Sequence, residues 1–249
     1  FGGERMKALA SDFDGTLYFE NGVKEDDRKA ILAFQKHHLF GLCTGRPLIG
    51  VQHYLENCIQ PDFYIVSSGA CILDKEGHVL YEQTLSKAIT KTIFEQYHEK
   101  AEVSIQADFR IYTLVQNSQI PLAQTYVESI DCIGDDHIFG LSINAVNEKQ
   151  AKQWTYDLNA TYKEIMAFQN KEYIDIVKRG CSKREAIKKL KSLLHLDYVY
   201  GIGDSYNDIP MLESADCSFT FYDSPEIVQK EATHLVSSVC EAIERIERE

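Results

Sequence analysis

Two pairs of carboxylates stand directly after apolar segments of the chain. In KALASDFDGT, residues 7–16, Asp12 and Asp14 follow a segment that reads as a buried strand. Residues two apart on a strand point to the same face, so both carboxylates can face one space at the strand's carboxyl end. Two like charges this close are costly unless a proton or a cation lies between them, and oxygen ligands suit Mg²⁺. This spacing predicts a magnesium site.

The second pair lies in GIGDSYNDIPML, residues 201–212. Asp204 follows another apolar segment, Asp208 comes four residues later in the first turn of a predicted helix, and Asn207 lies between them. These side chains offer further oxygen ligands for the same ion. Taken singly, each acidic cluster could equally consist of turn and helix-capping residues. Their joint occurrence favours the metal site.

Candidate partners for an anion lie in two further segments. GLCTGRP, residues 41–47, places Thr44 and Gly45 at the end of a predicted strand, where a hydroxyl, a backbone N–H and a helix start could hold a phosphate. A capping Thr with a turn Gly is the alternative. Lys183 begins a predicted basic helix, where its ammonium could reach an anion at the strand edge. We expect the other cations of that helix to be solvated: Arg184, Lys188, Lys189 and Lys191.

The elements that would position these residues form two kinds of pattern. Strands and helices alternate over the first eighty residues and again from Gly180, which predicts right-handed crossovers and a parallel sheet. The region between them is richer in hairpins. We therefore predict an α/β fold: a doubly wound, Rossmann-like core from residues 6–82 and 179–249, interrupted by an inserted α+β domain at 83–178. The expected core strands are 7–11, 40–43, 63–66 and 198–202, and the expected helices include 25–38, 47–57 and 86–100.

Composition limits the possible partners. The net charge of −12 argues against nucleic acid and anionic membrane surfaces. We expect no transmembrane helix, because no run of eighteen apolar residues occurs, and no secretory signal. Seven cysteines without a C-x-x-C pair are typical of reduced thiols, so we expect a cytoplasmic protein. A small phosphorylated substrate would have to be held by local cations. The oligomeric state stays open.

Four segments, in this order, resemble the haloacid dehalogenase (HAD) superfamily of phosphotransferases. They are DFDGT (12–16), CTGR (43–46), SKREA (182–186) and GDSYND (203–208). The large insert between the second and third segments resembles the type-IIB, Cof-like branch, whose C2B cap is inserted there. The resemblance implies a HAD core, a C2B-type cap and an enzyme, a HAD-type phosphatase that uses Mg²⁺ to hydrolyse small phosphate monoesters.

The resemblance also implies a role for each matching residue. Asp12 would be the nucleophile that forms an aspartyl-phosphate, and Asp14 would be the general acid and base. The phosphoryl oxygens would be held by the backbone N–H of Phe13 and by Thr44, Gly45, Lys183 and Asn207. The Mg²⁺ ion would be bound by Asp12, Asp204, the backbone carbonyl of Asp14 and, in the second shell or through water, Asp208.

One position departs from the family pattern. Cof-like relatives usually carry Asn before the Gly-Ala that follows the third strand, and here that residue is Ser68. The family's substrate preference is therefore not carried over, and a sugar phosphate and a phosphorylated metabolite or cofactor both remain open. The candidates for substrate contact in or beside the cap are Arg110, Tyr112, Tyr173 and Arg179, each of which could instead be a packing or surface residue.

Three other functions are compatible with the same residues. A hexose phosphomutase would use the same core and cap. A receiver-like signalling module, phosphorylated on Asp12, also uses acidic pairs, Mg²⁺, Thr and Lys, but it needs neither an acid at Asp14 nor a large cap. A protein that binds a phosphorylated ligand without turnover would not need both Asp12 and Asp14.

Overall fold

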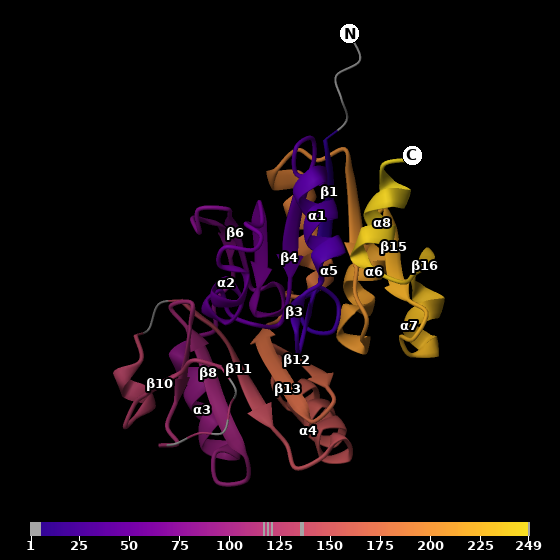
Figure 1. The fold of residues 1–249 in the computed structure, drawn as a ribbon. Helices are drawn as coiled ribbons and strands as arrows, with labels where there is room; N and C mark the ends of the chain where they lie inside the picture. The colour runs from indigo at the N-terminus through magenta and orange to yellow at the C-terminus, as the bar shows by residue number, and fades with distance from the viewer. Residues whose placement is uncertain (1–5, 117, 119, 121, 135–136, 249) are drawn as a thin grey trace.

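The computed structural model describes residues 6–116, 118, 120, 122–134 and 137–248. Two large β-sheets, each with its own helices, lie one above the other (Figure 1). The chain passes from the first sheet to the second after residue 82 and returns after residue 178. The predicted α/β class is confirmed, whereas the domain limits stay a prediction.

The eight-stranded sheet is parallel except at one edge. Its order is β16 (His234–Val236), β15 (Cys217–Phe221), β14 (Tyr198–Ile202), β1 (Lys7–Ser11), β4 (Leu39–Cys43), β5 (Phe63–Val66), β6 (Cys71–Asp74) and β7 (Val79–Glu82). From β1 the chain continues outward through β4 and β5, and later returns to add β14 on the other side of β1. In such open sheets, ligands bind beyond the carboxyl ends of the strands where the order reverses. Here that point lies between β1 and β14.

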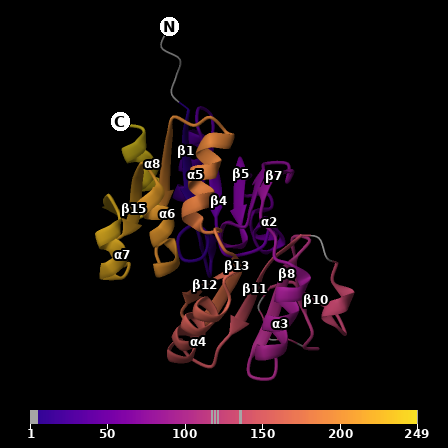
Figure 2. The ribbon, with the colours of Figure 1, turned by 180° about the vertical axis from the view of Figure 1, so that it is seen from behind.

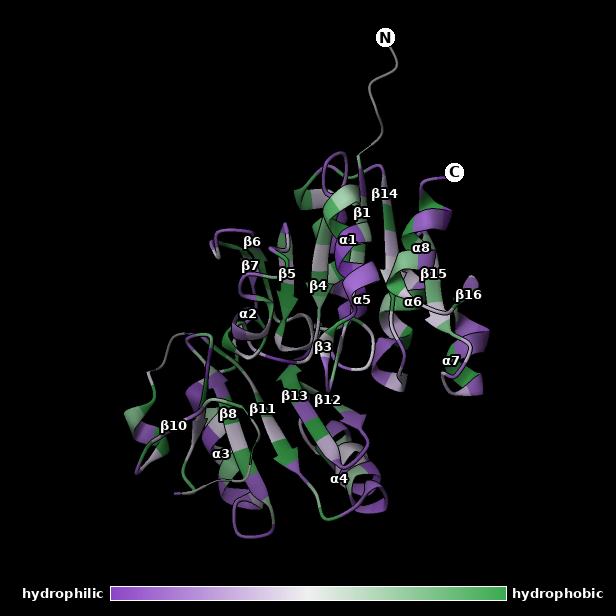
Figure 3. Ribbon diagram, in the orientation of Figure 1, coloured by the Kyte–Doolittle hydropathy of each residue, from purple (hydrophilic) through white to green (hydrophobic). Residues whose placement is uncertain are grey.

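Helices cover both faces of this sheet (Figures 1 and 2). One face packs on α1 (Glu25–Phe34), α2 (Ile49–Leu55) and α8 (Val239–Ile246), and the other on α5 (Lys183–Leu193), α6 (Ile209–Ser214) and α7 (Glu226–Glu231). Alternate residues of β1 divide between the two apolar cores: Leu9 joins the first, and Ala8 and Ala10 join the second. Because both faces are buried, the central strands are almost wholly apolar (Figure 3).

Helices cover one face of the six-stranded sheet. Its order is β10 (Thr125–Tyr126), β9 (Arg110–Thr113), β8 (Glu102–Ala107), β11 (Ile138–Asn144), β13 (Tyr173–Lys178) and β12 (Ile165–Asn170). Helices α3 (Lys87–Tyr97) and α4 (Glu148–Thr161) pack on that face and lie in front in Figure 2. Alternate residues such as Ile105, Ile143 and Ile174 are buried beneath them. We call this sheet and its two helices the cap.

Several predicted element bounds were wrong. The helix expected at 25–38 ends at Phe34, and the helix expected at 47–57 is Ile49–Leu55, which begins after Pro47 rather than at it. The helix expected at 86–100 is Lys87–Tyr97, because the Ser86 hydroxyl accepts from the N–H of Ile89 and caps it. Within the described ranges, no helix is long and apolar enough to cross a lipid bilayer.

Candidate active site

Asp12 and Asp204 meet at the reversal point of the larger sheet. They follow β1 and β14, which pair in parallel with Ser11 beside Ile202. Asp12, Asp204 and Asp208 each offer a carboxylate oxygen within 4.8 Å of the others. The segments predicted to share an ion, almost two hundred residues apart in sequence, thus lie together.

The turn after Asp14 fixes the Asp204 carboxylate. The Thr16 hydroxyl donates to Asp204 Oδ1 at 2.7 Å. Gly15, the residue between Asp14 and Thr16, has a φ of +78°, and a Cβ at this position would come within 2.9 Å of Asp204 Oδ2. Glycine is therefore required here both by the backbone angle and by the close approach of the carboxylate.

Lys183 is buried between two of these carboxylates. Its Nζ donates to Asp12 Oδ1 and to Asp208 Oδ1, each at 2.6 Å. The exposed fractions of Lys183, Asp12 and Asp208 are only 4%, 5% and 0%. Lys183 is the first residue of α5, and the Ser182 hydroxyl caps that helix by accepting from the N–H of Glu185. The start of α5 thus places an ammonium at the carboxyl end of β1.

One ammonium does not balance three carboxylates. Burial and the neighbouring Asp208 raise the pKa of Asp12 well above its usual range. Burial, followed by Asp208, raises the pKa of Asp204 to about 6. Burial opposes the charge of Lys183, but Asp12 and Asp208 outweigh it and raise the lysine pKa. The excess negative charge is of the kind that a divalent cation relieves.

These residues fit a magnesium ion. The donor set contains only oxygen, as Mg²⁺ prefers. Asp208 already uses both of its oxygens, since Oδ1 accepts from Lys183 and Oδ2 accepts from the backbone N–H groups of Asp204 and Ser205, at 3.0 Å each. Asp12 and Asp204 are therefore better placed for direct contact with an ion, and Asp208 for holding the lysine and the loop.

The side chain of Asp14 lies apart from that cluster, in an ion pair with Arg46. Arg46 Nη2 and Nε donate to its two oxygens at 2.5 and 2.7 Å. The guanidinium stacks over the rings of Phe13 and Tyr54, 5.1 Å from each centroid, and also donates to the carbonyl of Gly50. Sequence reasoning quoted Arg46 within a motif but did not foresee this pairing.

A cavity of about 480 Å³ joins most of the predicted core residues. Its walls include Asp12, Asp14, Thr44, Gly45, Asp204 and Asn207. The Thr44 hydroxyl accepts from the N–H of Arg46 at 3.1 Å. Oδ1 of Asn207 is buried and has no hydrogen-bond partner in the described part of the chain. Phe13 and Lys183 lie behind this wall, the first with a fully buried side chain.

The cap closes over the same cavity. Gln106 Nε2 donates to the carbonyl of Gly45 at 3.2 Å, and Asp175 Oδ2 lies 3.4 Å from the Ser68 hydroxyl. The Ile49 N–H donates to the carbonyl of Phe109 at 3.3 Å. Two loops of the larger sheet therefore touch the cap directly, and the cavity lies between the two sheets.

The family model of haloacid dehalogenase-like hydrolases matches residues 9–243 of this chain. The chain belongs to this family. The resemblance given by the four segments is thereby confirmed, and so is the expectation of an enzyme.

Two relatives from Bacillus subtilis (strain 168) span nearly the whole chain. The first, which bears the name putative phosphatase YxeH, is 26% identical over 243 residues, 90% of each chain. The 5-amino-6-(5-phospho-D-ribitylamino)uracil phosphatase YwtE is 24% identical over 270 residues, 94% of this chain and 93% of its own. These names support the expected HAD-type phosphatase.

Solved structures share the fold at low sequence identity. A haloacid dehalogenase-like hydrolase from B. subtilis superposes with a TM-score of 0.84 at 20% identity, over 95% of this chain and 96% of its own. The HAD subclass IIB sugar phosphatase BT4131 gives a TM-score of 0.80 at 19% identity, over 98% of both chains. This likeness shows that the fold, a larger sheet with an inserted cap, is shared with these proteins.

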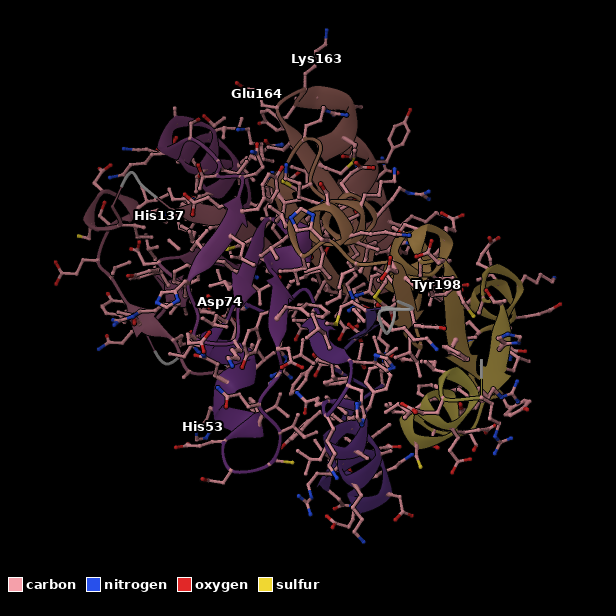
Figure 4. The ribbon with its side chains drawn as sticks, turned by 90° about the horizontal axis from the view of Figure 1, so that it is seen from above. His53, Asp74, His137, Lys163, Glu164 and Tyr198 are labelled. Atoms are coloured by element: carbon pink, nitrogen blue, oxygen red, sulfur yellow. The ribbon has the colours of Figure 1, made fainter. Side chains whose placement is uncertain are left out.

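Among the four cap candidates of this HAD hydrolase, only Tyr173 lines the cavity. Arg110 is exposed, and Tyr112 packs against the apolar core of the cap. The Arg179 guanidinium donates to the carbonyls of Tyr162 and Lys163. Figure 4 shows Lys163 and Glu164 at the edge of the molecule, so Arg179 is held there and not at the cavity.

Sequence reasoning missed the cap residues that do line the cavity. They are Glu102, Ser104, Gln106, Ser142, Asn144 and Asp175, with Asn170, Lys171 and Glu172 at the rim of their sheet. A signal was present, because polar residues alternate with apolar ones in EVSIQA, LSIN and YIDIV. Strand β8, which carries the first of these runs, was not predicted at all.

Proposed function

We propose that this HAD hydrolase is a Mg²⁺-dependent phosphatase that cleaves a small phosphate monoester through an aspartyl-phosphate on Asp12. The observation that carries the proposal is the cluster in which Lys183 binds Asp12 and Asp208 beside Asp204, at the edge of a cavity. The family match and the phosphatase names of relatives support it. A small phosphorylated substrate also agrees with the cavity volume of about 480 Å³.

In the first half-reaction, a carboxylate oxygen of Asp12 attacks phosphorus, the bond from phosphorus to the leaving oxygen breaks, and Asp14 gives that oxygen a proton. Thr44, Gly45, Asn207 and the backbone N–H of Phe13 hold the phosphoryl oxygens. Lys183 keeps Asp12 oriented through its bond to Oδ1. When bound, Mg²⁺ would neutralise charge on the phosphoryl oxygens and on Asp12 and Asp204.

In the second half-reaction, water attacks phosphorus, Asp14 takes a proton from the water, and inorganic phosphate leaves as the Asp12 carboxylate is restored. In the structure the Arg46 guanidinium donates to both oxygens of the Asp14 carboxylate. Asp14 must therefore leave this ion pair before it can act as an acid, and we assign that step to the arrival of the substrate.

The seven cysteines, all among the described residues, form no disulfide, which agrees with a reducing cytosol as the place of action. Nothing in the arrangement requires a polymeric substrate, because the cavity is enclosed between the two sheets. The partner expected from this site is a small phosphorylated metabolite.

The decisive test compares wild type with Asp12→Asn in phosphate release from a panel of monoesters with Mg²⁺. We expect a loss of about 10³-fold or more, because the variant lacks the nucleophile. Asp26→Asn, an exposed change on α1, is the control and should keep full activity. Activity that survives Asp12→Asn would overturn the nucleophile assignment.

The products also separate the alternatives. Isomerised sugar phosphate without free phosphate would identify a phosphomutase. A long-lived phosphoenzyme with negligible turnover would identify a signalling module, and binding with neither product would identify a ligand-binding protein.

A further inference from the structure

The cap presents a polar wall to the cavity because of the pleat of its strands. Side chains on one face of β8, β11 and β13 line the cavity, and those on the other face pack under α3 and α4. The polar members of this face are Ser104, Gln106, Ser142, Asn144, Tyr173 and Asp175, and the apolar cap residues Ile111, Ile120 and Leu122 also line the cavity. This wall faces the core residues assigned to the phosphoryl group. It is therefore the surface that would meet the leaving group.

The charges around this wall are mostly negative. Glu102, Glu172 and Asp175 come from the cap, facing Asp12, Asp14 and Asp204 of the core. Among the described residues that line the cavity, the lysines and arginines are Lys171, which is exposed, and Arg46, which is paired with Asp14. A second anionic group on the substrate would meet repulsion at close range in a partly enclosed space.

Asp175 is a cap carboxylate that lies directly against the core. Its Oδ2 lies 3.4 Å from the Ser68 hydroxyl, and a Cβ on Gly45 would come within 2.8 Å of the same oxygen. Gly45 is assigned to the phosphoryl group, so Asp175 lies beside the place where the leaving oxygen would sit. Burial raises the pKa of Asp175 to about 6, and the carboxylate is therefore mainly ionised at neutral pH.

On the basis of the phosphatase function above, we propose that the leaving group is rich in hydroxyl groups, neutral or amine-bearing, and without a second anionic substituent. Asp175 is a specificity-determining residue that accepts a hydrogen bond from it. A site built to accept from a hydroxyl or an ammonium rejects analogues that place an anion there, because the carboxylate then faces a like charge. Nucleotides, bisphosphates and phosphorylated acids are thereby disfavoured.

The test uses three six-carbon phosphates of nearly equal size that differ in charge: glucosamine 6-phosphate, glucose 6-phosphate and 6-phosphogluconate. A second pair, ribose 5-phosphate and ribose 1,5-bisphosphate, repeats the comparison in a shorter chain. We expect kcat/KM for each neutral or amine-bearing compound to exceed that of its anionic counterpart by about tenfold or more. Equal or higher values for the anionic compounds would overturn the proposal.

p-Nitrophenyl phosphate separates this proposal from the one on which it rests. If the enzyme hydrolyses p-nitrophenyl phosphate but none of the sugar phosphates, the substrate class is wrong and the phosphatase function stands. If it releases phosphate from no compound at all, the phosphatase function itself fails.

Asp175→Asn tests the residue, because it keeps the shape and removes the charge. We expect the ratio of kcat/KM between glucose 6-phosphate and 6-phosphogluconate to shrink about fivefold or more. Glu164→Gln, in the same cap but at its outer edge (Figure 4), is the control and should leave the ratio unchanged. An unchanged ratio in Asp175→Asn would remove Asp175 from the assignment. The wild-type comparison tests the substrate class even if this variant does not fold.

Discussion

The two walls of the cavity are built in different ways. Behind and within the core wall, Lys183, Asp12 and Asp208 are almost fully buried, and Lys183 donates to each of the two carboxylates at 2.6 Å. On the cap wall, polar side chains stand at alternate positions of three strands, and Asp175 is only partly buried. The transfer of the phosphoryl group is the same for every phosphate ester, so it benefits from rigidly placed groups such as those of the core wall. Recognition of the leaving group by the cap wall does not require the same rigidity. The contrast agrees with the division of labour that we propose.

The core wall also carries a larger electrostatic cost than the cap wall. Three carboxylates surround one ammonium there, and burial disfavours the ionised forms of Asp12 and Asp204. A fixed arrangement of this kind is stable only with its counter-charges in place. Changes to those counter-charges should therefore have larger effects than changes on the cap wall.

Removal of the metal should have the largest effect. With EDTA in place of Mg²⁺, we expect phosphate release to fall about 10³-fold or more, and Mg²⁺ should raise the melting temperature because it binds only the folded cluster. The rise in melting temperature that Mg²⁺ produces should largely disappear in Asp204→Asn. It should persist in Glu172→Gln, a change on the cap wall. An equal shift in both variants would contradict the placement of the ion on the core wall.

Loss of the buried ammonium of Lys183 should have the second-largest effect. Lys183→Met leaves Asp12 and Asp208 buried without their cation, so we expect the free energy of unfolding to fall by about 3–5 kcal/mol. Lys188→Met removes a lysine whose ion pair with Glu185 lies at the surface, and should change the free energy of unfolding by about 0.5 kcal/mol or less. Urea unfolding of both variants in the absence of Mg²⁺ measures the difference. Similar stabilities would show that Lys183 is not the counter-charge of the cluster.

The core wall was largely predictable from sequence. Its residues lie in short segments directly after apolar strands, and the carboxyl ends of parallel strands meet at one edge of a sheet. The proximity of Asp12 and Asp204 could therefore be predicted, and the structure places them within one cluster. The pairing of Asp14 with Arg46 could not be foreseen, because it depends on rotamers and on the rings of Phe13 and Tyr54.

The cap wall was not predicted, for a physical reason. Each of its residues is a single polar position in an amphipathic strand, and the same alternation arises when a strand simply faces water. Asp175 in YIDIV could equally have been a solvated side chain. Only the packing of α3 and α4 on the opposite face, and the contact with Ser68, show that this face meets the core.

A substitution between the two walls should have an intermediate effect. Gly45→Ala adds a Cβ that would lie 2.8 Å from Asp175 Oδ2 and 3.3 Å from the Ser68 hydroxyl. We expect the cap to shift away from the core, with kcat/KM about tenfold lower and a stability loss of about 1–3 kcal/mol. Gly134→Ala is the matched control, since no atom of the described residues lies within 4 Å of its added Cβ. Normal kinetics for Gly45→Ala would show that the walls need not approach this closely.

The smallest effect concerns the pH dependence of stability from Asp175. Burial raises its pKa in the folded chain to about 6, partly offset by bonds to Ser142 and Ser68 and by the charge of Lys183. The pKa of an unfolded Asp is about 3.9. Between these values the folded state keeps a proton that the unfolded state has lost, so the contribution of Asp175 to stability is largest below about pH 4 and falls as the pH rises to about 6.

Asp175→Asn removes this dependence, because an amide does not titrate in that range. We expect the free energy of unfolding of wild type, minus that of the variant, to fall by about 1–2 kcal/mol between pH 4.5 and pH 7. The whole difference between the folded and unfolded pKa values would correspond to about 3 kcal/mol. Solvent near this partly buried carboxylate reduces that value. Urea unfolding at several pH values measures the difference, and Glu164→Gln should give a flat profile. A flat profile for Asp175→Asn as well would mean that water reaches this carboxylate freely, and the cap wall would then be more open than its contacts with Gly45 and Ser68 indicate.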